Sequence, residues 1–256
     1  MGGARQPRED GPPPVPPSHQ GCAIRSVRVQ LPARRGEPGG EPRAELRDRH
    51  EDGHHLHHLV WRLGPGVRVC SSAVLGGGIG PRAWILNAQV PGGYPRLDPD
   101  RHLAEIAASE GLTGPGAGLM TAADVAAYTT GHDGGVTATA TTGLGVRGWA
   151  AASDAEAATP HRPGTINIVV TLPVALSDAA LVNAVATATE AKVQALLDAG
   201  LDCSGTPTDA VCVAAPEPGP DGAEPFAGPR STWGARIARA VHTAVLAGAR
   251  PARDLS

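Results

Sequence analysis

The chain has 22 lysine and arginine residues, and only one of them, Lys192, is a lysine. An arginine stays protonated inside a protein, whereas a lysine that is removed from water can lose its proton. A lysine held in a pocket can therefore act as a base, or it can donate to an anionic transition state. The alternative is that Lys192 buries its methylene groups and keeps its ammonium in water.

Lys192 falls within a predicted helix that starts after Ser177, a good N-cap, and stops at Gly200. The helical repeat places Lys192 on an apolar stripe of this helix. The other members of the stripe are Leu181, Val185, Ala188 and Ala195. Glu190 falls at the edge of the stripe or beyond it, so the two charged residues do not form a simple pair on one face.

A second segment with reactive groups precedes a glycine run. Ser72 follows Ser71 at the end of a predicted strand, just before three consecutive glycines at 76–78. Ser72 could be a nucleophile, with the glycine amides as an oxyanion hole, although a serine in a turn is the commoner explanation. The glycine run could also hold a phosphate, but it lacks the spacing and the lysine of a P-loop.

Two later segments place polar groups at the start of predicted strands. The segment GTPTDA contains Thr206, Thr208 and Asp209. Asp209 could act as a general base or orient another group, and its alternative role is to cap a turn. The segment GTIN ends in Asn167, which requires a hydrogen-bond partner if it is buried. A structural hydrogen bond explains Asn167 more simply than contact with a ligand. His161, in a proline-rich loop, is a weaker acid–base candidate.

The composition argues against several classes of protein. The net charge is -3 and no basic patch follows the N-terminal region, which argues against a nucleic-acid partner. The four cysteines show no CxxC spacing, so they indicate reduced thiols in a cytoplasmic protein and neither a zinc site nor a disulfide framework. No run of about 18 apolar residues occurs, so no membrane span is expected.

The order of predicted elements favours an α/β or α+β fold with a mixed sheet and packed helices. Residues 1–57 are polar and proline-rich, and we expect a disordered tail. A single domain follows at 58–249, with a short tail at 250–256. Strands are predicted at 59–63, 67–73, 83–90, 136–142, 165–172 and 209–214, and helices at 98–111, at 177–200 and after Ser231. The segment GLMTA at 118–122 is either shaped to a surface or a tight turn.

Five histidines gather at the end of the predicted tail: His50, His54, His55, His57 and His58. Their spacing could seat a metal ion if the segment were helical. Compositional bias explains the cluster more simply, so no metal site and no other cofactor are expected.

Several segments occur together in a characteristic order. They are SSA with the following GGG, Asn87 with Val90, GLMTAA, GTINI, ATEAK, GT with TDA, and AGP. In this order the chain resembles the adenosylcobinamide amidohydrolases, the CbiZ family, from about residue 58 to residue 249. GTIN, ATEAK and TDA are specific in combination, whereas each alone is weak. Residues 144–149 depart from the pattern of the family.

The resemblance implies hydrolysis of the amide that joins aminopropanol to the corrin ring of adenosylcobinamide. The products would be adenosylcobyric acid and 1-amino-2-propanol, and the role would be salvage and remodelling of B12-type corrinoids in the cytoplasm. The cobalt belongs to the corrinoid substrate. Because a corrinoid is large and mostly neutral, with amides around its rim, its site should be wide and lined by small apolar residues and polar donors.

The expected catalytic groups are four. Glu190 or Asp209 would activate water or a hydroxyl, and Lys192 would stabilise the oxyanion or act as a base. Ser72 is the first candidate for the nucleophile, followed by two threonines, 165 and 208. Contacts with the substrate are expected from Ser71, Gly77, Gly78, Asn87, Met120, Thr121, Thr165, Asn167, Thr206 and Thr208.

Three other functions fit parts of the sequence. The first is a corrinoid-binding protein without hydrolysis. The second is a Ser/Lys-type amidase that acts on another amide, and the third is a phosphate-binding enzyme that uses the glycine run. The order of the segments favours the hydrolase over all three, and it assigns no oligomeric state.

Overall fold

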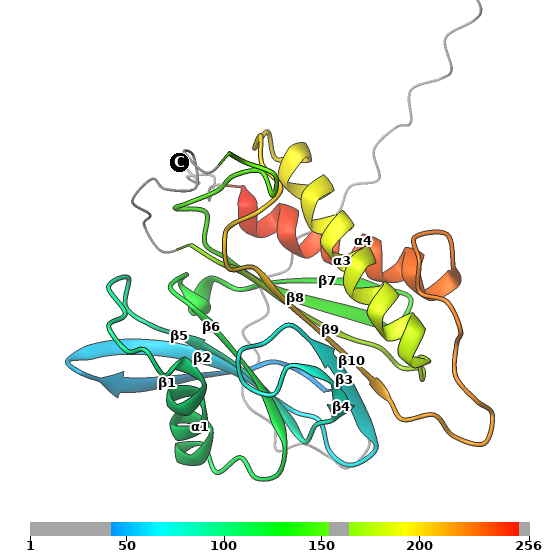
Figure 1. Cartoon of the computed structure of the whole chain (residues 1–256), viewed down its shortest axis with the longest axis horizontal. Helices are drawn as coiled ribbons and strands as arrows, with labels where there is room; N and C mark the ends of the chain where they lie inside the picture. Colours follow the sequence, from blue (N-terminus) through cyan, green and yellow to red (C-terminus); the bar gives the residue numbers. More distant parts are fainter. Residues whose placement is uncertain (1–41, 154–163, 251–256) are drawn as a thin grey trace, which may run out of the picture. The chain divides into compact units, whose positions relative to one another are not determined.

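Two mixed β-sheets lie at the centre of the fold in the computed structural model, which describes residues 42–153 and 164–250 (Figure 1). The four-stranded sheet has the order β1-β2-β5-β6 and consists of β1 (Glu45–Glu51), β2 (His54–Arg62), β5 (Trp84–Gln89) and β6 (Gly116–Thr121). The six-stranded sheet has the order β4-β3-β10-β9-β8-β7 and consists of β4 (Gly78–Pro81), β3 (Val67–Ser71), β10 (Ala210–Pro216), β9 (Ile166–Thr171), β8 (Val136–Thr142) and β7 (Thr129–Asp133). The expected mixed α/β class is confirmed, with two sheets where one was expected.

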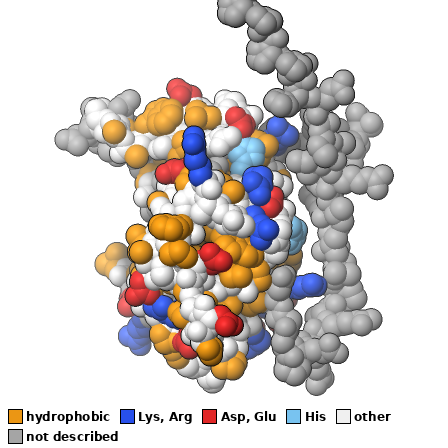
Figure 2. Space-filling model, turned by 90° about the vertical axis from the view of Figure 1, so that its right-hand side faces the viewer, with side chains coloured by type: hydrophobic (Ala, Val, Ile, Leu, Met, Phe, Trp, Pro, Cys, Tyr) orange, Lys and Arg blue, Asp and Glu red, His pale blue; other side chains and the backbone are white. Residues whose placement is uncertain are grey.

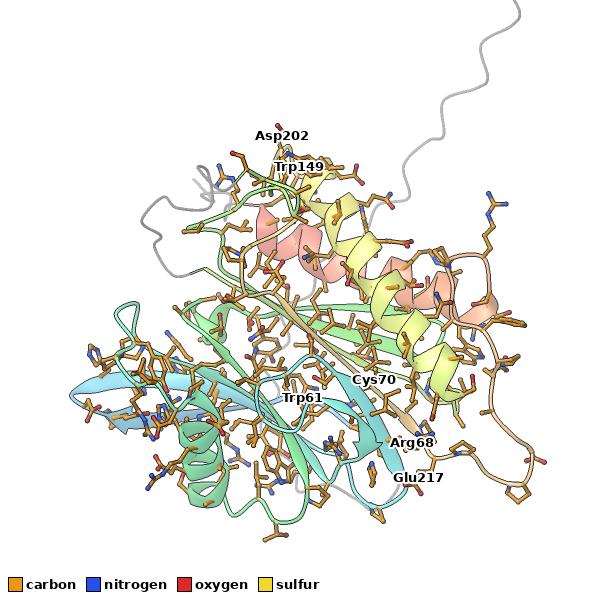
Figure 3. The ribbon with its side chains drawn as sticks, in the orientation of Figure 1. Trp61, Arg68, Cys70, Trp149, Asp202 and Glu217 are labelled. Carbon is orange, nitrogen blue, oxygen red and sulfur yellow. The ribbon has the colours of Figure 1, made fainter. Side chains whose placement is uncertain are left out.

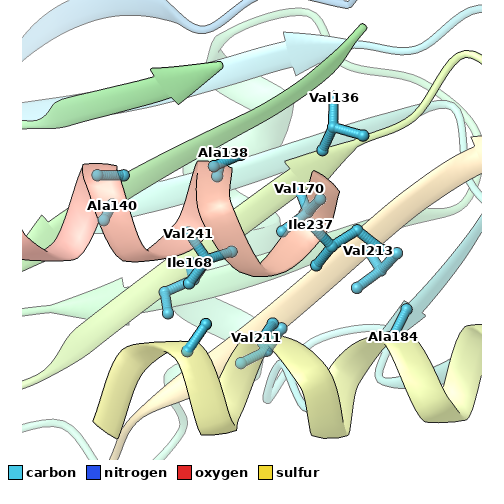
Figure 4. Close-up of a cluster of buried hydrophobic side chains, with 14 of the residues drawn as sticks. Val136, Ala138, Ala140, Ile168, Val170, Ala184, Val211, Val213, Ile237 and Val241 are labelled. Atoms are coloured by element: carbon cyan, nitrogen blue, oxygen red, sulfur yellow. The ribbon is translucent and has the colours of Figure 1, made fainter. Parts of the chain in front are cut away.

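Helices cover the outer face of each sheet. The six-stranded sheet carries α3 (Asp178–Asp198) and α4 (Thr232–Ala249), whose small apolar side chains meet those of β8, β9 and β10 (Figure 4). The four-stranded sheet carries α1 (Pro99–Ser109). The inner faces of the two sheets pack against each other through a second core that includes Trp61 and Val169, and the 3-10 helix η1 (Val125–Ala127) contributes to it.

Strand β9 is buried on both faces because it lies between these two cores. Successive side chains of a strand point to opposite faces of the sheet. Ile166, Ile168 and Val170 therefore pack toward α3 and α4, whereas Asn167 and Val169 face the four-stranded sheet. β10 runs parallel to β9, with Ala210 opposite Asn167. Groups that precede the two strands consequently meet at one end of the six-stranded sheet.

The folded part of the chain begins earlier than the sequence indicates. β1 and the first residues of β2 form an antiparallel hairpin within residues 45–57, which were expected to be disordered. The hairpin is held in place by an ion pair from His102 to Glu51 at 2.6 Å and by a hydrogen bond from Arg49 to the Gln89 carbonyl at 2.6 Å. Most of its side chains are histidine, arginine or acidic, so the alternation typical of a strand was hidden.

Residues 118–121 of the segment GLMTA form the end of strand β6, so the alternative of a tight turn is wrong. β6 begins at Gly116, where a Cβ atom would overlap the ring of Trp84, so the close packing of this strand requires a glycine. The other predicted elements are confirmed. Ser177 and Ser231 cap α3 and α4, with hydroxyls that accept from Ala180 at 3.1 Å and from Gly234 at 3.0 Å.

Side chains of different kinds are mixed on the face of the molecule that Figure 2 shows. Acidic, basic and apolar side chains are interspersed on the face shown in Figure 2. None of the helices within residues 42–153 and 164–250 has the length and apolar character needed to cross a membrane. His161 lies outside the described residues.

Candidate functional site

Lys192 lies on the side of α3 that faces the six-stranded sheet. Only 8% of its side chain is exposed, and Ala188, Ala191 and Ala195 around it belong to the core. The predicted apolar stripe is therefore confirmed, and the alternative in which the ammonium reaches water is wrong. Glu190 is exposed on the same helix, and no hydrogen bond or ion pair joins it to Lys192.

The ammonium of Lys192 meets a carboxylate at the end of the sheet. Lys192 Nζ donates a short hydrogen bond to Oδ2 of Asp209, whose side chain is 11% exposed. Asp209 immediately precedes β10, so the parallel pairing of β9 and β10 brings it next to the start of β9. The sequence segments ATEAK and TDA thus meet in a nearly buried ion pair.

Asp209 accepts three further hydrogen bonds. Oδ1 accepts from the amide of Ile166 at 2.9 Å and, through a short bond, from the hydroxyl of Thr206. Oδ2 also accepts from the amide of Thr206 at 3.1 Å. A carboxylate offers about four acceptor positions, and with Lys192 all of them are occupied. The carboxylate is therefore fixed in position, and the one hydroxyl among its donors is that of Thr206.

Gly205 lets the backbone pass directly against this ion pair. A Cβ atom at this position would overlap both the Asp209 carboxylate and the Lys192 ammonium. The carbonyl of Gly205 accepts from the amide of Gly148 at 3.0 Å. The loop around Gly148 belongs to the segment that departs from the family pattern, and no site residue was predicted there.

The same loop brings a large aromatic side chain to this end of the sheet. Ala150 donates to the Ser204 hydroxyl at 2.8 Å, which joins the loop before residue 153 to the segment before Asp209. Figure 3 shows Trp149 beside Asp202 there, and Trp149 is 46% exposed. Trp149 follows Gly148, whose amide bonds to the Gly205 carbonyl. An exposed tryptophan on this loop offers a flat apolar surface to a ligand.

Two threonines form a neighbouring pair of hydroxyls. The Oγ1 atoms of Thr165 and Thr208 lie 2.6 Å apart. Thr165 is buried, whereas Thr208 is exposed and Thr206 is half-buried. The site is therefore closed on the side of α3 and open at Thr208, where a substrate could approach.

Asn87 and Asn167 form a buried network behind the site, between the two sheets. Asn167 Nδ2 donates to Oδ1 of Asn87 at 2.8 Å and to the carbonyl of Met120 at 3.0 Å. Asn87 Nδ2 donates to the hydroxyl of Thr141 at 3.0 Å. The expected structural hydrogen bond of Asn167 is confirmed. These bonds tie the start of β9 to β5, β6 and β8, so they support the strand that presents Thr165.

Ser72 lies at the same end of the sheet but is engaged differently. Its hydroxyl accepts from the amide of Val211 at 3.1 Å, and its own amide donates to the Val211 carbonyl at 3.0 Å. Ser72 is exposed and stands two positions from Asp209 across the β3–β10 pairing. Gly77 and Gly78 are exposed at the start of β4, and neither donates to a bond at the Lys192–Asp209 pair.

The hydroxyls of Ser71 and Thr121 are used in local turns. Ser71 Oγ accepts from the amide of Ala73, and Thr121 Oγ1 accepts from the amide of Ala123, both at 3.0 Å. Both side chains are buried, with 7% and 2% exposure. They fix the backbone where β3 and β6 end.

Cys203 lies in the loop before Asp209, but it is not a nucleophile of the thiolate type. The residue is fully buried, and burial raises the pKa of its thiol. A thiol attacks as the thiolate, whose population falls as the pKa rises.

Three metal-ligating side chains converge, within the described residues, at Asp48, His50 and His55 on the β1–β2 hairpin, and no such group surrounds Lys192.

Comparison with known proteins identifies the family to which the chain belongs. The family model described as adenosylcobinamide amidohydrolase matches residues 43–256. An adenosylcobinamide amidohydrolase of Methanosarcina mazei is 34% identical over 184 residues, which cover 69% of this chain and 88% of that protein. One from Halobacterium salinarum is 46% identical over 85 residues, or 33% of this chain and 36% of that protein. The chain therefore belongs to the CbiZ family, the adenosylcobinamide amidohydrolases.

Proposed function

We propose that Thr206, Asp209 and Lys192 hydrolyse the amide bond that links aminopropanol to the corrin ring of adenosylcobinamide. The observation that carries this proposal is the hydrogen-bonded series from the Thr206 hydroxyl through the Asp209 carboxylate to the Lys192 ammonium. Amide hydrolysis is the activity of the family. The three residues supply the hydroxyl, the proton acceptor and the positive charge that this reaction needs.

The reaction proceeds in two steps through an ester. Thr206 Oγ1 attacks the amide carbonyl carbon and passes its proton to Asp209, while Lys192 stabilises the negative charge on the carbonyl oxygen. Asp209 gives the proton to the nitrogen, the C–N bond breaks, and 1-amino-2-propanol leaves. The ester then frees one acceptor position on Asp209. A water molecule occupies it, loses a proton to Asp209 and attacks the ester carbonyl carbon. Asp209 then returns this proton to Thr206 Oγ1 as the ester C–O bond breaks, which releases adenosylcobyric acid and restores both residues.

The hydrogen bonds favour Thr206 over the other candidates for the nucleophile. Asp209 has no spare acceptor position for a water molecule in the resting site, and Thr206 is the hydroxyl that already donates to it. Ser72 accepts a backbone hydrogen bond, and no carboxylate or imidazole bonds to it among the described residues. Glu190 is exposed on the far side of α3, so we assign the base to Asp209.

The surroundings suit a large neutral substrate. Trp149 and Thr208 are exposed at the open side of the site and would contact the corrin ring and its amide rim. Asn87, Asn167 and Met120 support these contacts from behind, through the buried network between the sheets. We place the reaction in the cytoplasm, because the cysteines at 70, 203 and 212 carry free thiols.

The test is turnover of adenosylcobinamide by the purified protein, with mass spectrometry for both products. Thr206→Val should lower kcat by at least about 100-fold, whereas Thr206→Ser should keep much of it, because only serine retains the hydroxyl. Hydroxylamine should cleave the ester formed on the wild-type chain and release the corrinoid as its hydroxamate. Normal turnover by Thr206→Val would refute the nucleophile. A change in corrinoid absorbance without products would instead support a corrinoid-binding protein.

A further inference from the structure

One face of the β1–β2 hairpin gathers four side chains that can bind metals. In the register of the two strands His50 lies opposite His55, and Asp48 lies opposite His57. Positions two apart on a strand, and positions opposite each other on paired strands, point to the same face. Asp48, His50, His55 and His57 therefore project together, close to the turn at residues 52–53.

The ligand atoms of three of these residues already lie near one another. One ligand atom from each of Asp48, His50 and His55 lies within 4.8 Å of the other two. His55 Nε2 and Asp48 Oδ2 are 3.2 Å apart. Two ligands of a tetrahedral zinc ion are about 3.3 Å apart, given metal–ligand bonds of about 2.0 Å. The His55–Asp48 pair therefore has the required separation, and the ligand atom of His50 lies within 4.8 Å of both.

The remaining contacts show that the imidazoles are packed as a group. The ring centroids of His50 and His55 are 4.7 Å apart, and those of His55 and His57 are 5.0 Å apart. Asp48 is exposed, and its carboxylate contacts the His55 ring at 3.2 Å. Neutral imidazole and ionised carboxylate are the forms that bind metals.

We propose that Asp48, His50 and His55 bind one divalent transition-metal ion, with Zn²⁺ as the best match to two imidazoles and a carboxylate. Imidazole suits zinc, nickel and copper, whereas magnesium and calcium prefer oxygen ligands alone. The helical spacing of these histidines is irrelevant here, because cross-strand pairing brings them together. The bound ion joins β1 to β2 near their turn and stabilises the hairpin that packs against α1.

The test is titration of the full chain, freed of metal with EDTA, with ZnCl₂ in a calorimeter. We expect one Zn²⁺ per chain, and at least about tenfold weaker binding in His50→Ala, His55→Ala and Asp48→Asn. His54→Ala is the matched control, because His54 lies on the same hairpin but opposite Glu51, on the other face. Its affinity should equal that of the wild type. Co²⁺ should give the visible absorption of a nitrogen- and oxygen-ligated site.

Two further measurements keep the result unambiguous. Thermal unfolding in EDTA should give the same Tm for the wild type and the variants, since the side chains of Asp48 and His55 are more than half exposed. Added ZnCl₂ should raise the Tm of the wild type and of His54→Ala only. The proposal is overturned if the wild type binds no Zn²⁺, or if binding survives both His50→Ala and His55→Ala. No corrinoid is present in these measurements, so they are independent of the hydrolase proposal.

Discussion

Substitution of Asp209 should destabilise the protein more than substitution of Lys192, its partner in the ion pair. After Lys192→Met, Asp209 keeps three donors, namely the amide and hydroxyl of Thr206 and the amide of Ile166. After Asp209→Asn, the ammonium of Lys192 has no other hydrogen-bond partner among the described residues. The second variant therefore leaves a buried charge uncompensated, whereas the first leaves a carboxylate that is still well bonded.

The magnitudes follow from the burial of the pair. The two side chains are 8% and 11% exposed, so solvent screens their interaction little. Leaving a buried charge without its partner costs about 3–5 kcal/mol, which we expect for Asp209→Asn. Losing one hydrogen bond to a charged group costs about 1.5–3 kcal/mol, which we expect for Lys192→Met. Both variants should lose at least about 100-fold in kcat, because each removes a group of the reaction.

Urea denaturation followed by circular dichroism measures the free energies of unfolding, and product formation from adenosylcobinamide measures kcat. Asp202→Asn is the matched control, because it makes the same chemical change at an exposed carboxylate of the same loop. It should alter stability by less than about 0.5 kcal/mol. Equal destabilisation by Asp209→Asn and Lys192→Met would refute the account of the hydrogen bonds. Near-normal kcat in Lys192→Met would refute the catalytic role of the lysine.

Three further predictions concern single residues. Gly205→Ala should abolish turnover and destabilise the fold by about 1–3 kcal/mol in urea denaturation, because its Cβ would overlap the ion pair. Gly92→Ala, where no atom lies within 4 Å of the added Cβ, should change neither property. Ser72→Ala should keep product formation within a few-fold of the wild type, and a loss of about 100-fold would instead identify Ser72 as the nucleophile. Burial raises the pKa of Cys212 from 9.0 to about 12, so the folded state holds this proton more tightly than the unfolded chain. Stability should therefore be intact below pH 9.0 and should fall as the pH rises from there toward about 12, and urea denaturation of Cys212→Ala should show a weaker fall.

The spacing of apolar residues was sufficient to predict the strands and helices whose buried side chains follow a regular pattern. Ile168 and Val170 lie in a mostly apolar run typical of a central strand, and the stripe through Ala188 and Ala195 indicated the buried face of α3. Lys192 stood out because it is a charged residue within this apolar stripe. The approach of Asp209 to it depended on the parallel pairing of β9 and β10, which no local pattern encodes.

Other elements could not be predicted, because their residue types are typical of more than one kind of structure. The β1–β2 hairpin consists mostly of histidine, arginine and acidic residues, so it lacked the apolar period of a strand. Glycines at 116 and 118 gave β6 the composition of a turn, although they are needed for contact with Trp84 and Leu103. The role of Gly205 was equally hidden, because a glycine reveals a close approach only when its neighbour in space is known.

The alanines of α3 act as spacers that set how far Lys192 can reach. Ala184, Ala188, Ala191 and Ala195 are all buried against the six-stranded sheet or α4, so the helix axis lies close to the strands. A valine in place of any of them would push the helix outward by a fraction of an ångström. Such a shift separates the ammonium from Asp209 while most of the core remains packed. The volume of the side chains at these positions therefore limits how far α3 can move before the reaction fails. Substitutions there should abolish turnover before they unfold the protein.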